Sequence, residues 1–147
     1  MKRKLILLAG GLVGTTVLTA LHQTIRKTLP DIAPRMDLLD IELIHKAGNE
    51  LNITLPSDKD LYKMTFIGEF VGNTAYYSLI GTTFPRLNAW FLGTLAGAGA
   101  VVLPEHFGIN PAPSNRTKAT QYLTIGYYVT GALAAAATVR WLKRITK

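Results

Sequence analysis

Four apolar stretches, separated by segments that hold nearly all of the charged residues, constrain this chain more than any other feature of its sequence. They cover residues 5–25, 61–80, 86–103 and 119–142. A helix rises 1.5 Å per residue, so about 20 apolar residues cross the ~30 Å hydrocarbon core of a bilayer. We therefore predict an all-α polytopic integral membrane protein in which four spanning helices form one transmembrane bundle and residues 1–147 form a single membrane domain.

The largest polar segment, residues 26–60, joins the first two predicted spans. Pro30 and Pro34 break the first helix. Residues 36–47 then predict a short extra helix, acidic at its start and basic at its end, with Gly48 as the residue that terminates it.

Local signals also mark the ends of the later spans. Ser57, with Asp60 three residues further on, predicts an N-cap for the second span. Pro85 suits the first turn of the third span, and Pro104 is expected to end it.

The basic residues indicate an orientation and a partner. The formal net charge is +7, and compact Lys/Arg clusters flank the apolar stretches at both ends of the chain. The raw tally of Lys and Arg is eight on each side of the predicted membrane, but on one side seven of the eight lie in these two clusters. We expect that side, which holds both termini, to face the cytoplasm. This placement favours the lipid bilayer as the partner and argues against nucleic acid.

Pairs of small residues four positions apart occur in three of the predicted spans. Such pairs let neighbouring helix backbones approach closely in lipid. They fit packing inside one bundle, and they also fit an interface with a second copy or a partner subunit. The residues are Gly10, Gly14, Gly93, Gly97, Gly131 and Ala135.

Glu69 is the one acidic residue in the middle of a predicted span. It shares a helix face with Thr65, Asn73 and Tyr76, because these positions are three or four residues apart. A charge at the bilayer centre costs ~2.5–3.5 kcal/mol, so Glu69 must face the bundle, be neutral or have a partner. We interpret this face either as interhelical hydrogen bonding or as a path for protons or solute. The expected partners are Asn73, Tyr76, Tyr127, Thr15 and Thr16.

Signals for metal binding and catalysis are weak. His22, His106 and Glu105 are the best metal candidates, but their spacing matches no known metal motif, so no metal or cofactor is expected. The chain has no cysteine, no Walker A loop and no GxSxG elbow. We predict that it is not an enzyme.

Three features together resemble a known group of proteins. They are the glycine-rich first span, the Pro-Arg-Met-Asp turn at residues 34–37 and the Pro-Ala-Pro-Ser-Asn-Arg-Thr loop at residues 111–117. The chain is similar to the small uncharacterised four-helix inner-membrane proteins of bacteria. That resemblance implies the inner membrane as its location, but no activity and no functional residue.

Two functions follow as expectations. The first is a non-enzymatic helical bundle that acts as an accessory subunit or forms an oligomer. The alternative is a small transporter or channel with an intramembrane polar site at Glu69, Asn73 and Tyr76.

Overall fold

The protein is all-helical, as the sequence predicts. The structure, a computed structural model, describes residues 2–146 and contains no strand within that range. The helices are α1 (Lys2–Thr28), α2 (Met36–Glu50), α3 (Asp58–Ser78), α4 (Pro85–His106), α5 (Ala112–Asn115) and α6 (Lys118–Ile145).

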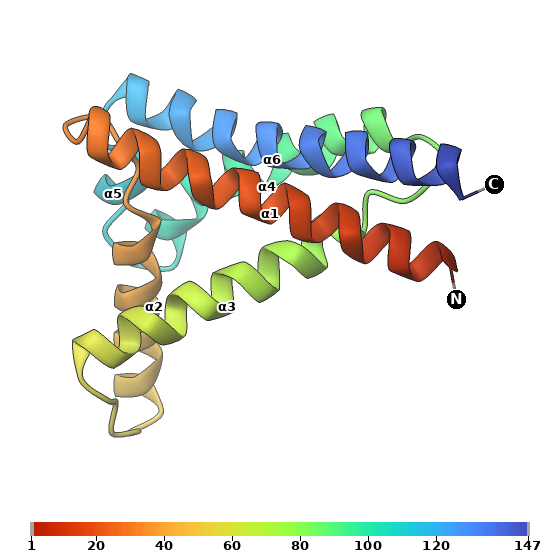
Figure 1. Cartoon of the computed structure of the whole chain (residues 1–147). Helices are drawn as coiled ribbons and strands as arrows, with labels where there is room; N and C mark the ends of the chain where they lie inside the picture. Colours follow the sequence, from red (N-terminus) through yellow and green to blue (C-terminus); the bar gives the residue numbers. More distant parts are fainter. Residues whose placement is uncertain (1, 147) are drawn as a thin grey trace.

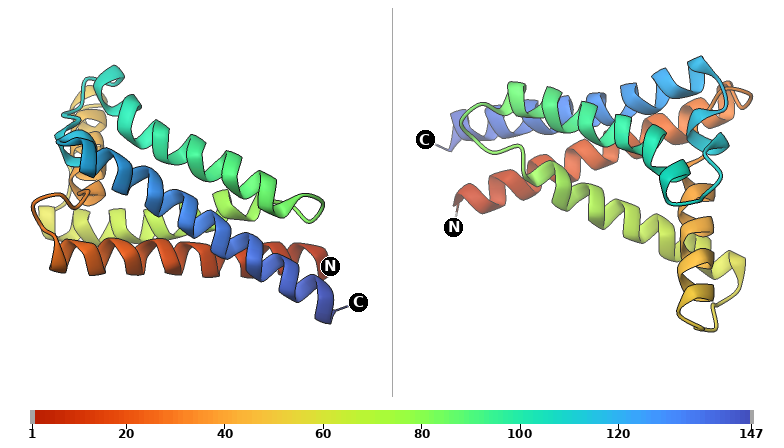
Figure 2. Two further views of the ribbon diagram at one scale, coloured as in Figure 1. Left: turned by 90° about the horizontal axis from the view of Figure 1, so that it is seen from above. Right: turned by 180° about the vertical axis from the view of Figure 1, so that it is seen from behind.

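Three of these helices, α1, α4 and α6, are long and apolar enough to cross a membrane. They lie roughly side by side, with α6 between α1 and α4 (Figure 2). The second predicted span, α3, has 21 residues but is less apolar, because Lys63, Glu69 and Asn73 lie along it. Three helices are therefore long and apolar enough to span a membrane, and a spanning α3 stays a prediction.

The helices α2 and α3 form an open V against this trio instead of completing a compact four-helix bundle (Figure 1). The 15 residues of α2 lie across the end of the trio. They carry the chain about 22 Å sideways before α3 begins. The C-terminal half of α3 then returns to α1, where the hydroxyl of Thr74 donates to the hydroxyl of Thr15 at 3.2 Å. The N-terminal half of α3 contacts α2 instead.

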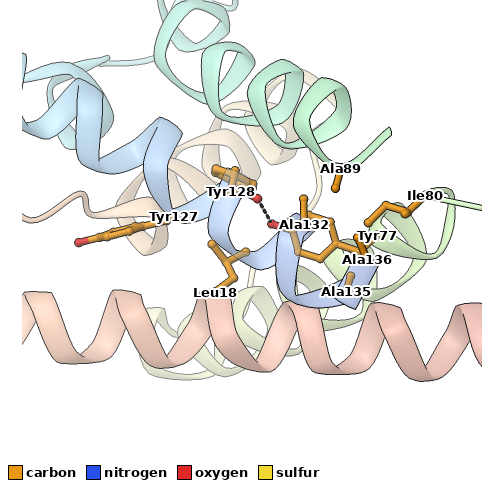
Figure 3. Close-up of a cluster of buried hydrophobic side chains, with 9 residues drawn as sticks. All are labelled: Leu18, Tyr77, Ile80, Ala89, Tyr127, Tyr128, Ala132, Ala135 and Ala136. Atoms are coloured by element: carbon orange, nitrogen blue, oxygen red, sulfur yellow. Dashed lines mark hydrogen bonds between the residues drawn. The ribbon is translucent and has the colours of Figure 1, made fainter. Parts of the chain in front are cut away.

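The centre of the trio is a small core, shown in Figure 3. The alanines of α6 make it thin, and Tyr77 from α3 fills it and is fully buried. The Tyr77 hydroxyl donates to the backbone oxygen of Tyr128 at 3.0 Å. The buried members of the core are Leu18, Tyr77, Ile80, Ala89, Tyr127, Tyr128, Ala132, Ala135 and Ala136.

The helix-boundary predictions had mixed outcomes. Ser57 caps α3 by accepting from the Asp60 amide, and Pro85 lies in the first turn of α4, so both predictions are confirmed. Gly48 does not end α2, which continues to Glu50. Gly48 is buried in the helix beneath Leu55, and the left-handed residue that follows the helix is Asn52, with φ 53°.

Pro104 does not end α4 either, since the helix continues to His106. A proline has no N–H to donate to the oxygen four residues before it, here that of Ala100. The Ser114 hydroxyl of α5 donates to that oxygen instead, at 2.7 Å, and Ser114 is fully buried. The short helix α5 thus supplies the hydrogen bond that allows α4 to continue.

Candidate functional site

A small polar cavity lies where α1, α2 and α3 meet. Its volume is about 40 Å³, more than the ~10–15 Å³ that a cavity needs to hold one water molecule. Glu69 lines it together with His22 and Arg26 of α1 and Asp37 of α2. Both α1 residues lie in the last two turns of that helix. Glu69 is therefore near one end of the trio, although it lies in the middle of its own helix. The reason is that α3 splays away from the other long helices.

The partner of Glu69 is Asp40 of α2, which the sequence analysis did not identify. The two carboxyl groups are close enough to share a hydrogen bond. Asp40 Oδ2 is buried and has no hydrogen-bond partner among the groups of residues 2–146. Two ionised carboxylates can only accept, so the pair needs one shared proton and then carries a single negative charge.

Burial is the main reason why the pKa of Asp40 lies above its usual range. The hydrogen bond from Glu69 acts in the opposite direction, and the nearby charge of Asp37 adds to the effect of burial. Both the desolvation and the like charge disfavour a second negative charge at this place.

Asp37, one turn before Asp40, is in a different electrostatic position. Its carboxylate accepts two hydrogen bonds from Arg35, at 2.9 and 2.8 Å, and one from Arg26 at 3.3 Å. Burial acts to raise the pKa of Asp37, but the two guanidinium groups outweigh it and the pKa lies below its usual value. Arg26 and Arg35, the positively charged residues near the cavity, thus pair with Asp37, and neither pairs with Asp40 or Glu69.

The predicted polar face of α3 divides between two places. Thr65 and Asn73 line the cavity beside Glu69. Tyr76 instead donates its hydroxyl to the backbone oxygen of Leu92 on α4, at 2.9 Å.

The other partners expected for Glu69 form no hydrogen bond with it, and the buried Tyr127 hydroxyl has no partner among the described residues. Thr15 pairs with Thr74, and Thr16 donates to the Leu12 backbone of its own helix. The Tyr127 ring meets His22 edge to face, with ring centroids 4.7 Å apart.

One sequence signal pointed to Asp40. It is spaced three residues from Asp37, and it lies beside the apolar residues Met36 and Leu39, which are buried. Residues spaced by three share a helix face, so Asp37 and Asp40 lie on the same side of α2. The buried residues beside them indicate that this side is close to the other helices.

The metal candidates are not brought together. His22 lines the cavity, His106 interacts with the Val102 backbone on its own helix, and Glu105 is exposed. Within the described part of the chain, no group of three His, Cys, Asp or Glu side chains is placed to hold a metal ion.

The predicted small residues lie where helices of this one chain meet. A Cβ added to Gly14 would lie 2.6 Å from the Gly131 oxygen and 2.8 Å from Ala135 Cβ, and one added to Gly10 would lie 2.6 Å from Val139. On the other side of α6, Cβ atoms added to Gly93 and Gly97 would lie 2.7 and 2.6 Å from Cα atoms of that helix. Three other glycines differ, because an added Cβ would meet nothing within 4 Å. They are Gly68 and Gly72 on α3 and Gly126 on α6.

Comparison with known proteins gives no relative from which a role could be transferred. No protein-family model matches the chain, and no curated protein and no solved structure is significantly similar to it.

Proposed function

We propose that this chain is a four-pass protein of the bacterial inner membrane with both termini in the cytoplasm. The path of the chain supports the fourth crossing. It leaves α1 at one end of the trio and enters α4 at the other end, where both ends of the chain also lie (Figure 1). Between these points α3 is the segment that returns, so it crosses the same thickness as its neighbours.

The charges support the orientation. The end of the trio that holds both chain ends carries Lys2, Arg3 and Lys4 on α1 and Arg140, Lys143 and Arg144 on α6. Neither α1 nor α6 contains an acidic residue. Basic flanks of this kind remain on the cytoplasmic side of a bilayer.

Within the membrane we propose a non-enzymatic role as a subunit that assembles through α3. The observation that supports it is the contrast between glycines. Those of α1 and α4 at the α6 contacts meet neighbouring helices closely, whereas Gly68 and Gly72 are open. Ile67 and Val71, which flank them, are each 62% exposed. Small residues spaced by four between exposed aliphatic side chains suit the close approach of another membrane helix.

Cross-linking tests this role directly, because the chain has no native cysteine. Gly72→Cys places a single thiol on the open face, and Gly126→Cys is the matched control on an equally open glycine of α6. Oxidation in native membranes should join Gly72→Cys to a second copy, or to a cysteine-bearing partner of different mass, and should leave Gly126→Cys monomeric. A monomeric Gly72→Cys variant, with no co-purifying protein in mild detergent, would contradict the role.

The second candidate is a small transporter or channel, which the polar cavity beside Glu69 favours. The cavity is small, at about 40 Å³, and Leu18, which lines it, also belongs to the close-packed core of Figure 3. Assembly is therefore the better-supported function. Flux in proteoliposomes that disappears in folded Glu69→Gln would reverse this order, and unchanged flux would remove Glu69 from any transport role.

A further inference from the structure

A large apolar groove lies between α2, α3 and α4, on the other side of Asp40 from the polar cavity. The helices α3 and α4 are joined by a short turn but diverge from it (Figure 2). The groove between them has a volume of about 770 Å³. Its walls are mostly aliphatic and include Leu43 of α2 and Leu95 and Leu103 of α4, all well exposed.

Polar groups are few in this groove, and only one of them can be ionised near neutral pH. Asn73, Tyr76 and Tyr128 line it, and Asp40 is its single carboxyl group. The Tyr76 hydroxyl is already engaged with the Leu92 backbone. Asp40 Oδ2 has no hydrogen-bond partner among the described residues.

The surrounding charges do not neutralise Asp40. Arg26 and Arg35 are paired with Asp37. At the rim of the groove, Lys46 donates to the backbone oxygen of Phe107 at 2.7 Å. The apolar groove therefore ends at Asp40, which lies against Glu69 and whose shared negative charge no arginine of the cavity compensates.

We propose that this groove binds a lipid-soluble amine, with its hydrocarbon body along the aliphatic walls and its ammonium group donating to Asp40. The volume lies within the ~300–1,000 Å³ range of small-molecule sites. An ammonium group supplies a positive charge, which no neighbouring side chain gives Asp40, and a further hydrogen-bond donor for a carboxyl group with an unpartnered oxygen. A neutral lipid tail would leave the carboxylate uncompensated, and an anionic amphiphile would be repelled by it.

The test compares three eight-carbon probes on the full chain in phosphatidylcholine nanodiscs. Octylamine is the cationic probe, octanol the neutral one and octanoate the anionic one. Near saturation, octylamine should raise the melting temperature of the wild type by about 5 °C more than octanol does, because a ligand that binds only the folded state stabilises it. Octanoate should give no specific rise.

Two variants locate the site. Asp40→Asn should abolish the difference between octylamine and octanol, while Asp31→Asn, which removes an exposed acidic group outside the groove, should preserve it. Gly99→Leu tests the groove in a second way, without changing Asp40 or Glu69. A Cβ at Gly99 would meet only Leu103, at 3.4 Å, so the leucine should fill the groove and block the response.

Equal shifts from octylamine and octanol in the wild type would overturn the proposal and leave the groove as a site for lipid tails alone. An octylamine response that survives both Asp40→Asn and Gly99→Leu would overturn it as well.

Discussion

The contact between α4 and α6 should be very sensitive to a single added methyl group. In Gly97→Ala the new Cβ would lie 2.6 Å from Ile125 Cα, about 0.8 Å short of the 3.4 Å at which ordinary van der Waals contact begins. The neighbouring atom belongs to the backbone, so no side chain can rotate away. Either the two helices separate or the backbone deforms.

The expected loss of stability can be estimated against a matched control. Overpacking of this kind costs about 1–3 kcal/mol. Replacing glycine by alanine inside a helix also raises the stability by up to ~1 kcal/mol, because alanine has the higher helix propensity. Gly126→Ala, on α6 itself, has the same propensity gain but no contact within 4 Å. The two variants should thus differ by about 2 kcal/mol, or roughly 4–8 °C in melting temperature for a chain of this size.

Thermal unfolding in one mild detergent, followed by intrinsic fluorescence or circular dichroism, measures this difference. Gly126→Ala should melt at or slightly above the wild-type temperature, and Gly97→Ala clearly below it. Equal melting temperatures for the two variants would refute the argument that backbone contact at Gly97 fixes the spacing of α4 and α6.

Two further predictions concern buried polar groups. Ser114→Ala removes the donor to the Ala100 oxygen and should cost about 1–2 kcal/mol in thermal unfolding. Adding Pro104→Ala, which restores a backbone N–H, should recover part of that loss, and a strictly additive double mutant would contradict the compensation. Burial is the main cause that raises the pKa of the Asp40 carboxyl group, so the folded state binds the proton of this group more tightly than the unfolded chain does. The stability that the protonated Asp40 contributes is present below its pKa of ~3.9 in the unfolded chain. It is lost as the pH rises through the higher pKa of Asp40 in the folded state. Asp40→Asn should therefore melt with a flatter pH profile than the wild type, and an unchanged profile would remove this assignment.

The helices were largely predictable because their signals are local. Apolar stretches, the Ser57 cap and Pro85 depend on neighbours within a few residues along the chain. Pro104 shows the limit of such signals. Proline predicts the end of a helix unless another group satisfies the freed carbonyl, and here that group is Ser114, which comes from a separate helix.

The candidate site was predictable only in part. The cost of a charge in lipid identified Glu69 and its neighbours Thr65 and Asn73, and these do line a cavity together. Asp40 was missed because its approach to Glu69 depends on the angle between α2 and α3. The contacts that hold the C-terminal half of α3, made by Tyr77 with α6 and by Thr74 with α1, lie far along the chain from α2.

The sequence alone determined that this chain is helical and approximately where its long helices lie, and it indicated three that are apolar enough for lipid, because hydropathy and caps act over a few turns. Only the tertiary structure decided that α3 splays from the other long helices, that Asp40 rather than a hydroxyl meets Glu69, and that a groove opens beside the pair. Those features depend on how far two helices can approach. Backbone contacts at glycines set that distance for α1, α4 and α6, and Gly11 of α1 makes one with Thr74 in the C-terminal half of α3. No such contact holds the open face of α3 at Gly68 and Gly72.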